Sequence, residues 1–119
     1  MQDLNQNRRF VLWDYHPSLQ QLLIRSPKSD EDPKSENIDL IFRGVFYVQT
    51  SNWFRGLKIE KPTTDEIEKI KLTTGVSQDV EHQYFILATS GHRFIVGAAT
   101  LTINQNSYGF RESDIATFP

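Results

Sequence analysis

The 119-residue sequence contains no cysteine, and it has no long apolar run. Without cysteine there can be no disulfide, no thiolate zinc site and no cysteine nucleophile. The N-terminus, MQDLNQNRRF, lacks the apolar core of a secretory signal, and no later stretch reaches the roughly 20 apolar residues of a membrane span. We therefore expect a cytoplasmic protein that does not have a membrane as its partner.

A strong charge of either sign is also missing, because 13 Lys and Arg stand against 15 Asp and Glu. Such a balance does not draw in nucleic acid. The stretch RGVFYVQT at 43–50 begins like the first ribonucleoprotein motif, but Val45 and Phe46 stand where an aromatic and a small residue belong, and Thr50 replaces the closing aromatic. We expect a core strand there, and no nucleic-acid partner.

The length fits one domain, 1–119, with a single core. About six segments are rich in strand formers and are separated by turn signals. Gly44 interrupts the longest of them and predicts a bend. The segments are 8–15, 19–26, 38–51, 53–60, and two that form a hairpin around Ser90 and Gly91 within 83–104.

Three further segments complete the organisation of the chain. Residues 1–8 are polar and are expected to fray, and the polar stretch 26–37 predicts a mobile loop. The tail carries apolar side chains that should dock on the domain: Tyr108, Phe110, Ile115 and Phe118.

The segment KPTTDEIEKIKLTTG predicts the single helix. Thr63 and Glu66 form a capping box, and Gly75 supplies a C-terminal stop. Ile67 and Ile70 fall on one narrow face, which indicates that the helix covers a sheet. The expected fold is α+β, a mainly antiparallel twisted sheet or partly open barrel of about six strands with one helix packed on it.

Asp14 and His16 are the candidates for catalysis. Two residues apart on an extended segment, they project to one face, where the carboxylate could orient the imidazole as a base. No nucleophile elbow or phosphate-binding glycine loop accompanies them. The alternative reading is a histidine at the end of a strand that forms a hydrogen bond in the turn.

The possible metal donors do not have the spacing of a ligand motif. Scattered surface side chains are the simpler reading, so we expect neither a metal site nor a cofactor. The donors considered are Asp14, His16, Glu81, His82 and His92.

The segment NWFRG at 52–56 is the candidate for binding a protein partner. Trp53, Phe54 and Arg55, with Tyr47 nearby, are the residue types that anchor interfaces. Plain packing competes with this reading, because a small domain needs aromatics in its core. On a strand Trp53 and Phe54 point to opposite faces, so one can be core and the other exposed.

The stretches NIDLIFRGVFYVQ and FRGLKI, with RSPK before them and YFILATSGHRFIVGAATLTI after them, resemble small, uncharacterised single-domain bacterial proteins over about residues 10–105. Some such proteins resemble immunity proteins encoded beside toxin genes. The resemblance implies a bacterial stand-alone domain and carries over no site residue. The function that we expect is non-catalytic recognition of a protein partner or of a second copy; the alternative is a small-ligand site or enzyme that uses Asp14 and His16.

Overall fold

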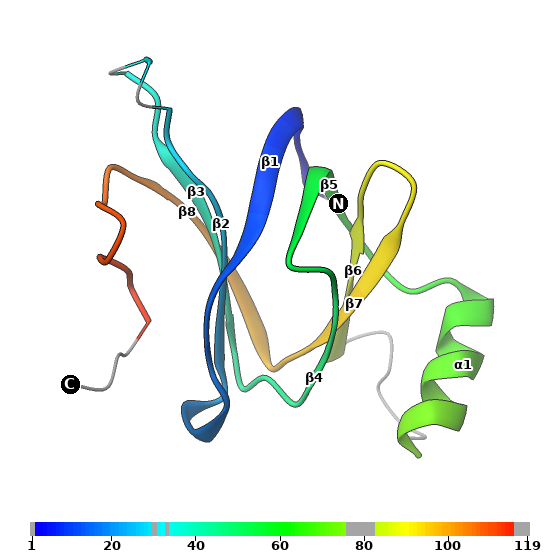
Figure 1. Cartoon of the computed structure of the whole chain (residues 1–119). Coiled ribbons are helices and arrows are strands. Elements are labelled where there is room, and N and C mark those ends of the chain that lie inside the picture. Colours follow the sequence, from blue (N-terminus) through cyan, green and yellow to red (C-terminus); the bar gives the residue numbers. More distant parts are fainter. Residues whose placement is uncertain (1, 30, 33, 76–82, 116–119) are drawn as a thin grey trace.

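The computed structural model describes residues 2–29, 31–32, 34–75 and 83–115, with side chains from Asn7 onward. Among these residues, one α-helix of defined bounds accompanies a single sheet of eight strands, all of whose pairings are antiparallel (Figure 1). The α+β class and the antiparallel sheet are therefore confirmed. In chain order the elements are β1 (Gln2–His16), a 3₁₀ turn η1 (Pro17–Leu19), β2 (Gln21–Ser26), β3 (Asn37–Arg43), β4 (Tyr47–Gln49), β5 (Trp53–Glu60), α1 (Thr64–Thr74), β6 (Tyr84–Ala88), β7 (Arg93–Gly97) and β8 (Thr100–Asn106).

The strands lie in the order β4-β7-β6-β5-β1-β2-β3-β8. The pair β4 and β7 lies at one end of this order and the pair β3 and β8 at the other, and the chain connects the two ends directly, from β3 to β4 and from β7 to β8. β4 follows β3 and β8 follows β7 after short bends. Across the bends the backbone N–H of Phe46 donates to Gly97 and that of Ala99 donates to Arg43, each at 3.0 Å. β3–β8 and β4–β7 are thus two parts of one bent ribbon, and the sheet curls on itself.

The same bends explain why the sheet has eight strands and not about six. Each of two expected long strands is divided, one into β3 and β4 and the other into β7 and β8. The predicted bend at Gly44 is present, with φ +69°. A Cβ at this position would lie 2.7 Å from the Cβ of Ala99, so the two bent strands approach as closely as they do because Gly44 has no side chain.

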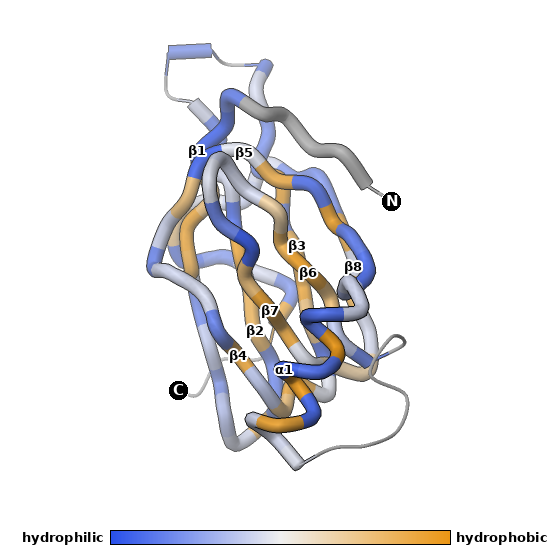
Figure 2. Tube along the Cα trace, turned by 90° about the vertical axis from the view of Figure 1, so that its right-hand side faces the viewer, coloured by the Kyte–Doolittle hydropathy of each residue, from blue (hydrophilic) through white to orange (hydrophobic). Residues whose placement is uncertain are grey.

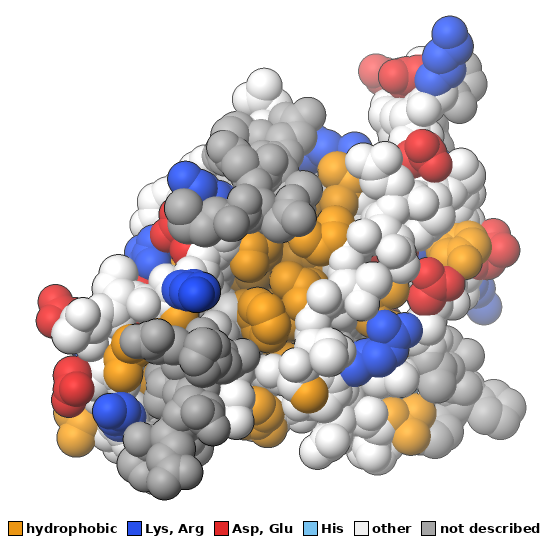
Figure 3. Space-filling view, turned by 180° about the vertical axis from the view of Figure 1, so that it is seen from behind, with side chains coloured by type: hydrophobic (Ala, Val, Ile, Leu, Met, Phe, Trp, Pro, Cys, Tyr) orange, Lys and Arg blue, Asp and Glu red, His pale blue; other side chains and the backbone are white. Residues whose placement is uncertain are grey.

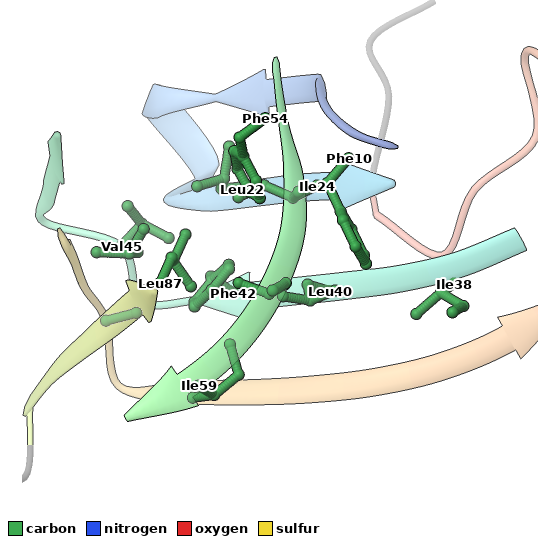
Figure 4. Close-up of a cluster of buried hydrophobic side chains, with 13 residues drawn as sticks. Phe10, Leu22, Ile24, Ile38, Leu40, Phe42, Val45, Phe54, Ile59 and Leu87 are labelled. Carbon is green, nitrogen blue, oxygen red and sulfur yellow. The ribbon is translucent and has the colours of Figure 1, made fainter. Parts of the chain in front are cut away.

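The main core fills the inside of the curl (Figure 4). Its side chains come from six strands and from the two bends, and rings from opposite parts of the sheet meet, as Phe42 and Phe85 do at 5.7 Å between centroids. Figure 2 shows that hydrophobic residues concentrate in the middle of the strands. The buried members are Phe10, Leu22, Ile24, Ile38, Leu40, Phe42, Val45, Phe54, Leu57, Ile59, Leu87, Val96 and Ala98.

Helix α1 begins and ends as its sequence predicts. Thr63 and Glu66 cap each other reciprocally, and Gly75 ends the helix in the left-handed conformation with φ +74°. Ile70 is 2 % exposed and packs with Ile67 against Tyr84 on the outer face of the sheet. The predicted packing of the helix on the sheet is therefore observed.

The N-terminal segment differs from its expected state. Residues from Gln2 onward belong to β1, where a frayed end was expected, and Gln2 to Leu4 pair with β5 from Ile59 to Leu57. Sequence alone did not show this pairing because its partner strand lies more than fifty residues further along the chain.

The connection between β2 and β3 is tied down at its base. The guanidinium of Arg8 donates to the Ser26 hydroxyl and to the carbonyls of Ser26, Pro27 and Glu36, at 2.7–3.2 Å. Partial burial lowers the pKa of Arg8. The polar loop therefore starts from two strand ends that are held together.

The tail docks on the outer face of β2 and β3, as expected, through Ile115, which is buried beside Leu23 and Ile41. Phe110 stays exposed, and Phe118 lies outside the described residues. Sequence reasoning missed the polar half of this contact, an ion pair between Arg25 and Asp39, which are 1 % and 0 % exposed.

This ion pair is bidentate, with N···O distances of 2.6 and 2.8 Å. The Arg25 guanidinium also donates to the carbonyls of Gly109 and Glu112 in the tail, at 3.3 and 2.9 Å. The side-chain amide of Asn106 donates to Asp39 at 2.8 Å. Because its hydrogen bonds are largely satisfied, the pair can remain buried under the tail.

Candidate protein-binding surface

Trp53 and Phe54 lie on opposite faces of β5, as the alternation of a strand predicts. Phe54 is 5 % exposed and stacks on Phe10, with 5.8 Å between the ring centroids. Trp53 points outward and is 52 % exposed. Phe54 is therefore a core residue, and Trp53 is the aromatic side chain that remains open to a partner.

Two arginines flank Trp53 on the outer face. In the pairing of β1 with β5, Val11 lies opposite Trp53 and Arg9 lies opposite Arg55. The Arg9 guanidinium sits over the Trp53 ring, 4.8 Å from its centroid. Arg55 is exposed and donates one hydrogen bond to the carbonyl of Asn7 at 2.9 Å. Arg9, Trp53 and Arg55 form what we name the Trp53 surface.

A surface hollow of about 560 Å³ adjoins the Trp53 surface. It lies between the start of β5 and the β6–β7 turn, where the Ser90 N–H donates to the Arg55 carbonyl at 3.2 Å. His92 stacks on Phe94 at its wall, with 5.6 Å between centroids. No carboxylate is present among its lining residues, which are Ser51, Asn52, Trp53, Phe54, Arg55, Thr89, Ser90, His92 and Phe94.

Tyr47 is not part of the Trp53 surface. It lies on β4, at one end of the strand order, and packs in the cluster under α1 with Ile70 and Tyr84. Its ring centroid is 6.0 Å from that of Tyr84. Tyr47 and Trp53 are only six positions apart in the sequence, which suggested that they lie close together, but the chain turns between β4 and β5 and separates them.

Sequence reasoning missed a second aromatic pair on the outer face. Trp13 meets Phe110 edge to face at 5.1 Å, and its indole N–H donates to the Phe110 carbonyl at 3.1 Å. Phe110 is 77 % exposed. Val11 lies opposite Trp53 on the neighbouring strand, and it lines a second hollow together with Trp13 and Phe110. No local signal joins positions 97 apart in the chain.

Asp14 and His16 do come together, as expected. A carboxylate oxygen of Asp14 lies 3.2 Å from Nε2 of His16, at the end of β1. The Asp14 side chain is 34 % exposed, and it lines a shallow hollow with Trp13 and Phe110. The arrangement can position an imidazole.

Within the described part of the chain, no three His, Asp or Glu side chains gather in a way that could hold a metal ion. Glu81 and His82 lie outside that part, and His92 belongs to the wall of the hollow. None of the described helices is long and apolar enough to cross a membrane.

Comparison with known proteins adds no relative to this picture. No family model, curated protein or solved structure matches the chain. The candidate surface therefore rests on its own geometry: an exposed tryptophan with Arg9 over its ring and Arg55 nearby, next to a hollow whose lining contains no carboxylate.

Proposed function

We propose that this protein is a non-catalytic recognition module that binds a protein partner through the Trp53 surface. The observation that carries the proposal is Trp53 itself, half exposed on a paired strand and covered on one side by Arg9. Tryptophan and arginine dominate the binding energy of protein interfaces, because they bury much area and add directional hydrogen bonds. A rigid strand presents them with little entropy left to lose on binding.

The charges around Trp53 favour an acidic segment on the partner. Arg9 and Arg55 stand on the surface, and the adjoining hollow has no carboxylate, although the whole chain carries a net charge of -2. A partner carboxylate would pair with either guanidinium while an apolar side chain covers the indole. The resemblance to bacterial immunity-like proteins suggests a neutralised toxin as such a partner.

The test is capture followed by calorimetric titration. A partner retained by the wild-type chain should bind Trp53→Ala at least about 30-fold more weakly and Arg55→Ala about 10-fold more weakly, in line with losses of about 2 and 1.4 kcal/mol at hot spots. Leu72→Ala is the matched control, because Leu72 is an 85 % exposed apolar residue on α1. Equal binding by Trp53→Ala and Leu72→Ala would refute the proposed surface.

The second candidate function is an enzyme or ligand site at Asp14 and His16, and the 3.2 Å contact between them favours it. The same variants distinguish this function from protein recognition, because the two functions depend on different residues. A turnover activity that survives Trp53→Ala and Arg55→Ala but disappears in His16→Ala would assign the protein to this class.

A further inference from the structure

Strand β8 ends the sheet and pairs only with β3 among the described strands. All seven of its residues, Thr100–Asn106, are in register with β3, without a bulge. The opposite edge of β8 therefore offers a regular row of backbone N–H and C=O groups to another strand.

The composition of β8 does not protect this edge. Natural proteins guard an edge strand with lysine, proline, a bulge or very short length. β8 reads TLTINQN, with neither a charged residue nor a proline. β4, at the other end of the sheet, has only three residues. The exposed edge of β8 is thus the one long enough and neutral enough to accept a partner strand.

The inside of the curl is also open beside β8. Leu101 and Ile103 point toward the main core and pack against it, yet both are only partly buried. Figure 3 shows hydrophobic side chains gathered in the middle of the back face, on the side where β8 lies. A strand added to β8 would cover apolar side chains in addition to pairing the backbone.

We propose that β8 pairs antiparallel with β8 of a second copy of this chain. The strand is complementary to itself: a two-fold axis at Ile103 pairs all seven residues, places Ile103 opposite Ile103, Leu101 opposite Gln105, and Thr102 opposite Asn104. No charge meets a like charge in this register, and apolar side chains from both copies lie on the same face.

The side chains of Asn104 and Asn106 hold β8 in place through hydrogen bonds to aspartates. Asn106 donates to Asp39 at 2.8 Å, and Asn104 donates to Asp114 at 3.3 Å, both on the outer face. These bonds fix the strand without occupying its free edge. β8 contributes no residue to the Trp53 surface or to the hollow beside it, so the two proposals can be tested separately.

The experiment is sedimentation equilibrium over a wide range of protein concentration. The wild-type chain should pass from monomer to dimer, and Thr102→Lys should raise the dimer dissociation constant about 10-fold or more, because it brings two lysines close across the axis. Thr73→Lys is the matched control: Thr73 is exposed on α1, far from β8 in sequence, and its substitution should leave the dimer unchanged.

Mixing two variants sharpens the test. Thr102→Lys and Thr102→Glu should each stay monomeric where the wild type dimerises, and an equimolar mixture should form a heterodimer. A wild-type chain that is monomeric throughout, or a Thr102→Lys variant that dimerises like the wild type with an unchanged circular dichroism spectrum, overturns the proposal. Retention of the dimer by Trp53→Ala separates this result from the fate of the proposed recognition function.

Discussion

Trp53 and Phe54 are neighbours in the chain with opposite environments, and they show what a residue pattern can predict. Alternation along β5 placed them on opposite faces. Which face becomes the core depends on the direction in which the sheet curls, and that is set by pairings between distant strands. The sequence could therefore predict that one ring is buried, but not that it is Phe54.

This difference leads to a prediction about stability. Phe54→Ala should lower the free energy of unfolding by about 3 to 5 kcal/mol, because it leaves a cavity beside Phe10 and Phe94. Trp53→Ala should lower it by about 1 kcal/mol or less, since its ring is half exposed. Denaturant unfolding of both variants measures the difference, and equal losses would contradict the assignment of core and surface.

Arg25 and Asp39 are the residues that sequence reasoning could not place. Charges that alternate with apolar side chains on a strand usually face water. Here the tail, more than 60 residues beyond either, covers them and supplies two carbonyl acceptors to Arg25. A pattern confined to one strand carries no information about a cover that comes from so far along the chain.

Asp39→Ala should destabilise the protein by about 3 to 5 kcal/mol, because the Arg25 guanidinium would remain buried with its main partner removed. Replacing both partners, as in Arg25→Met with Asp39→Leu, should cost less than the single change. Thermal and urea melts of the two variants decide the point. A loss below about 1 kcal/mol for Asp39→Ala would mean that water reaches the pair.

At the scale of the element, helix α1 was predictable almost to its ends, because its signals are local. The capping box, the glycine stop and the apolar face all lie within a dozen positions of one another. The strand ends were less predictable. The bends that divide β3 from β4 and β7 from β8 depend on contacts between Gly44 and Ala99, which come from different parts of the chain.

The helix should depend more on its packing than on its cap. Ile70→Ala should cost about 2 to 4 kcal/mol by opening the contact with Tyr84 and Ile67, whereas Thr63→Ala should cost about 1 kcal/mol through the lost cap. Denaturant melts that rank the two variants in the opposite order would show that α1 does not rest on the sheet.

An ion pair ties the start of the helix to β7 and gives a dependence on pH. Hydrogen bonds from Arg93 hold the pKa of Glu66 at about 2, below its ordinary value of 4.5, while partial desolvation opposes them. A lowered folded-state pKa stabilises the protein above the unfolded-state value, and the stabilisation disappears as the pH falls toward the folded-state value.

The stability advantage of the wild type over Glu66→Gln should therefore be constant above about pH 5 and should shrink between about pH 4.5 and 2. Urea melts across this range give the measurement. An advantage that does not change with pH would contradict the ion pair, and the exposure of the arginine limits the effect to a modest size.

At the scale of the whole molecule, the α+β class and a twisted sheet or partly open barrel followed from length and pattern, whereas the order of the strands did not. Strand existence is a local property, but the order of strands depends on pairings such as β1 with β5. The Trp53 surface could likewise be predicted only in part. Trp53 was a candidate because of its residue type, but Arg9, which lies over its ring, comes from another strand. The pair of Trp13 and Phe110 joins β1 to the tail, so it could not be predicted either.

The loop between β2 and β3 projects from the body of the molecule (Figure 1), and its predicted mobility can be tested there. Replacing 29–35 with a short turn keeps the three carbonyls that Arg8 binds, so the free energy of unfolding should change by about 1 kcal/mol or less. Limited proteolysis should cut the wild type first in this segment. Unfolding of the shortened variant would show that the loop is a structured part of the domain.

The tail that covers Arg25 and Asp39 has a consequence for how the protein is made. During synthesis β2 and β3 leave the ribosome before 107–115, so Arg25 and Asp39 stay in contact with water until the tail follows them. Domains fold as units once enough chain is available. The tail can cover this ion pair only after it has emerged, so the burial of Arg25 and Asp39 waits for the last-made part of the described chain.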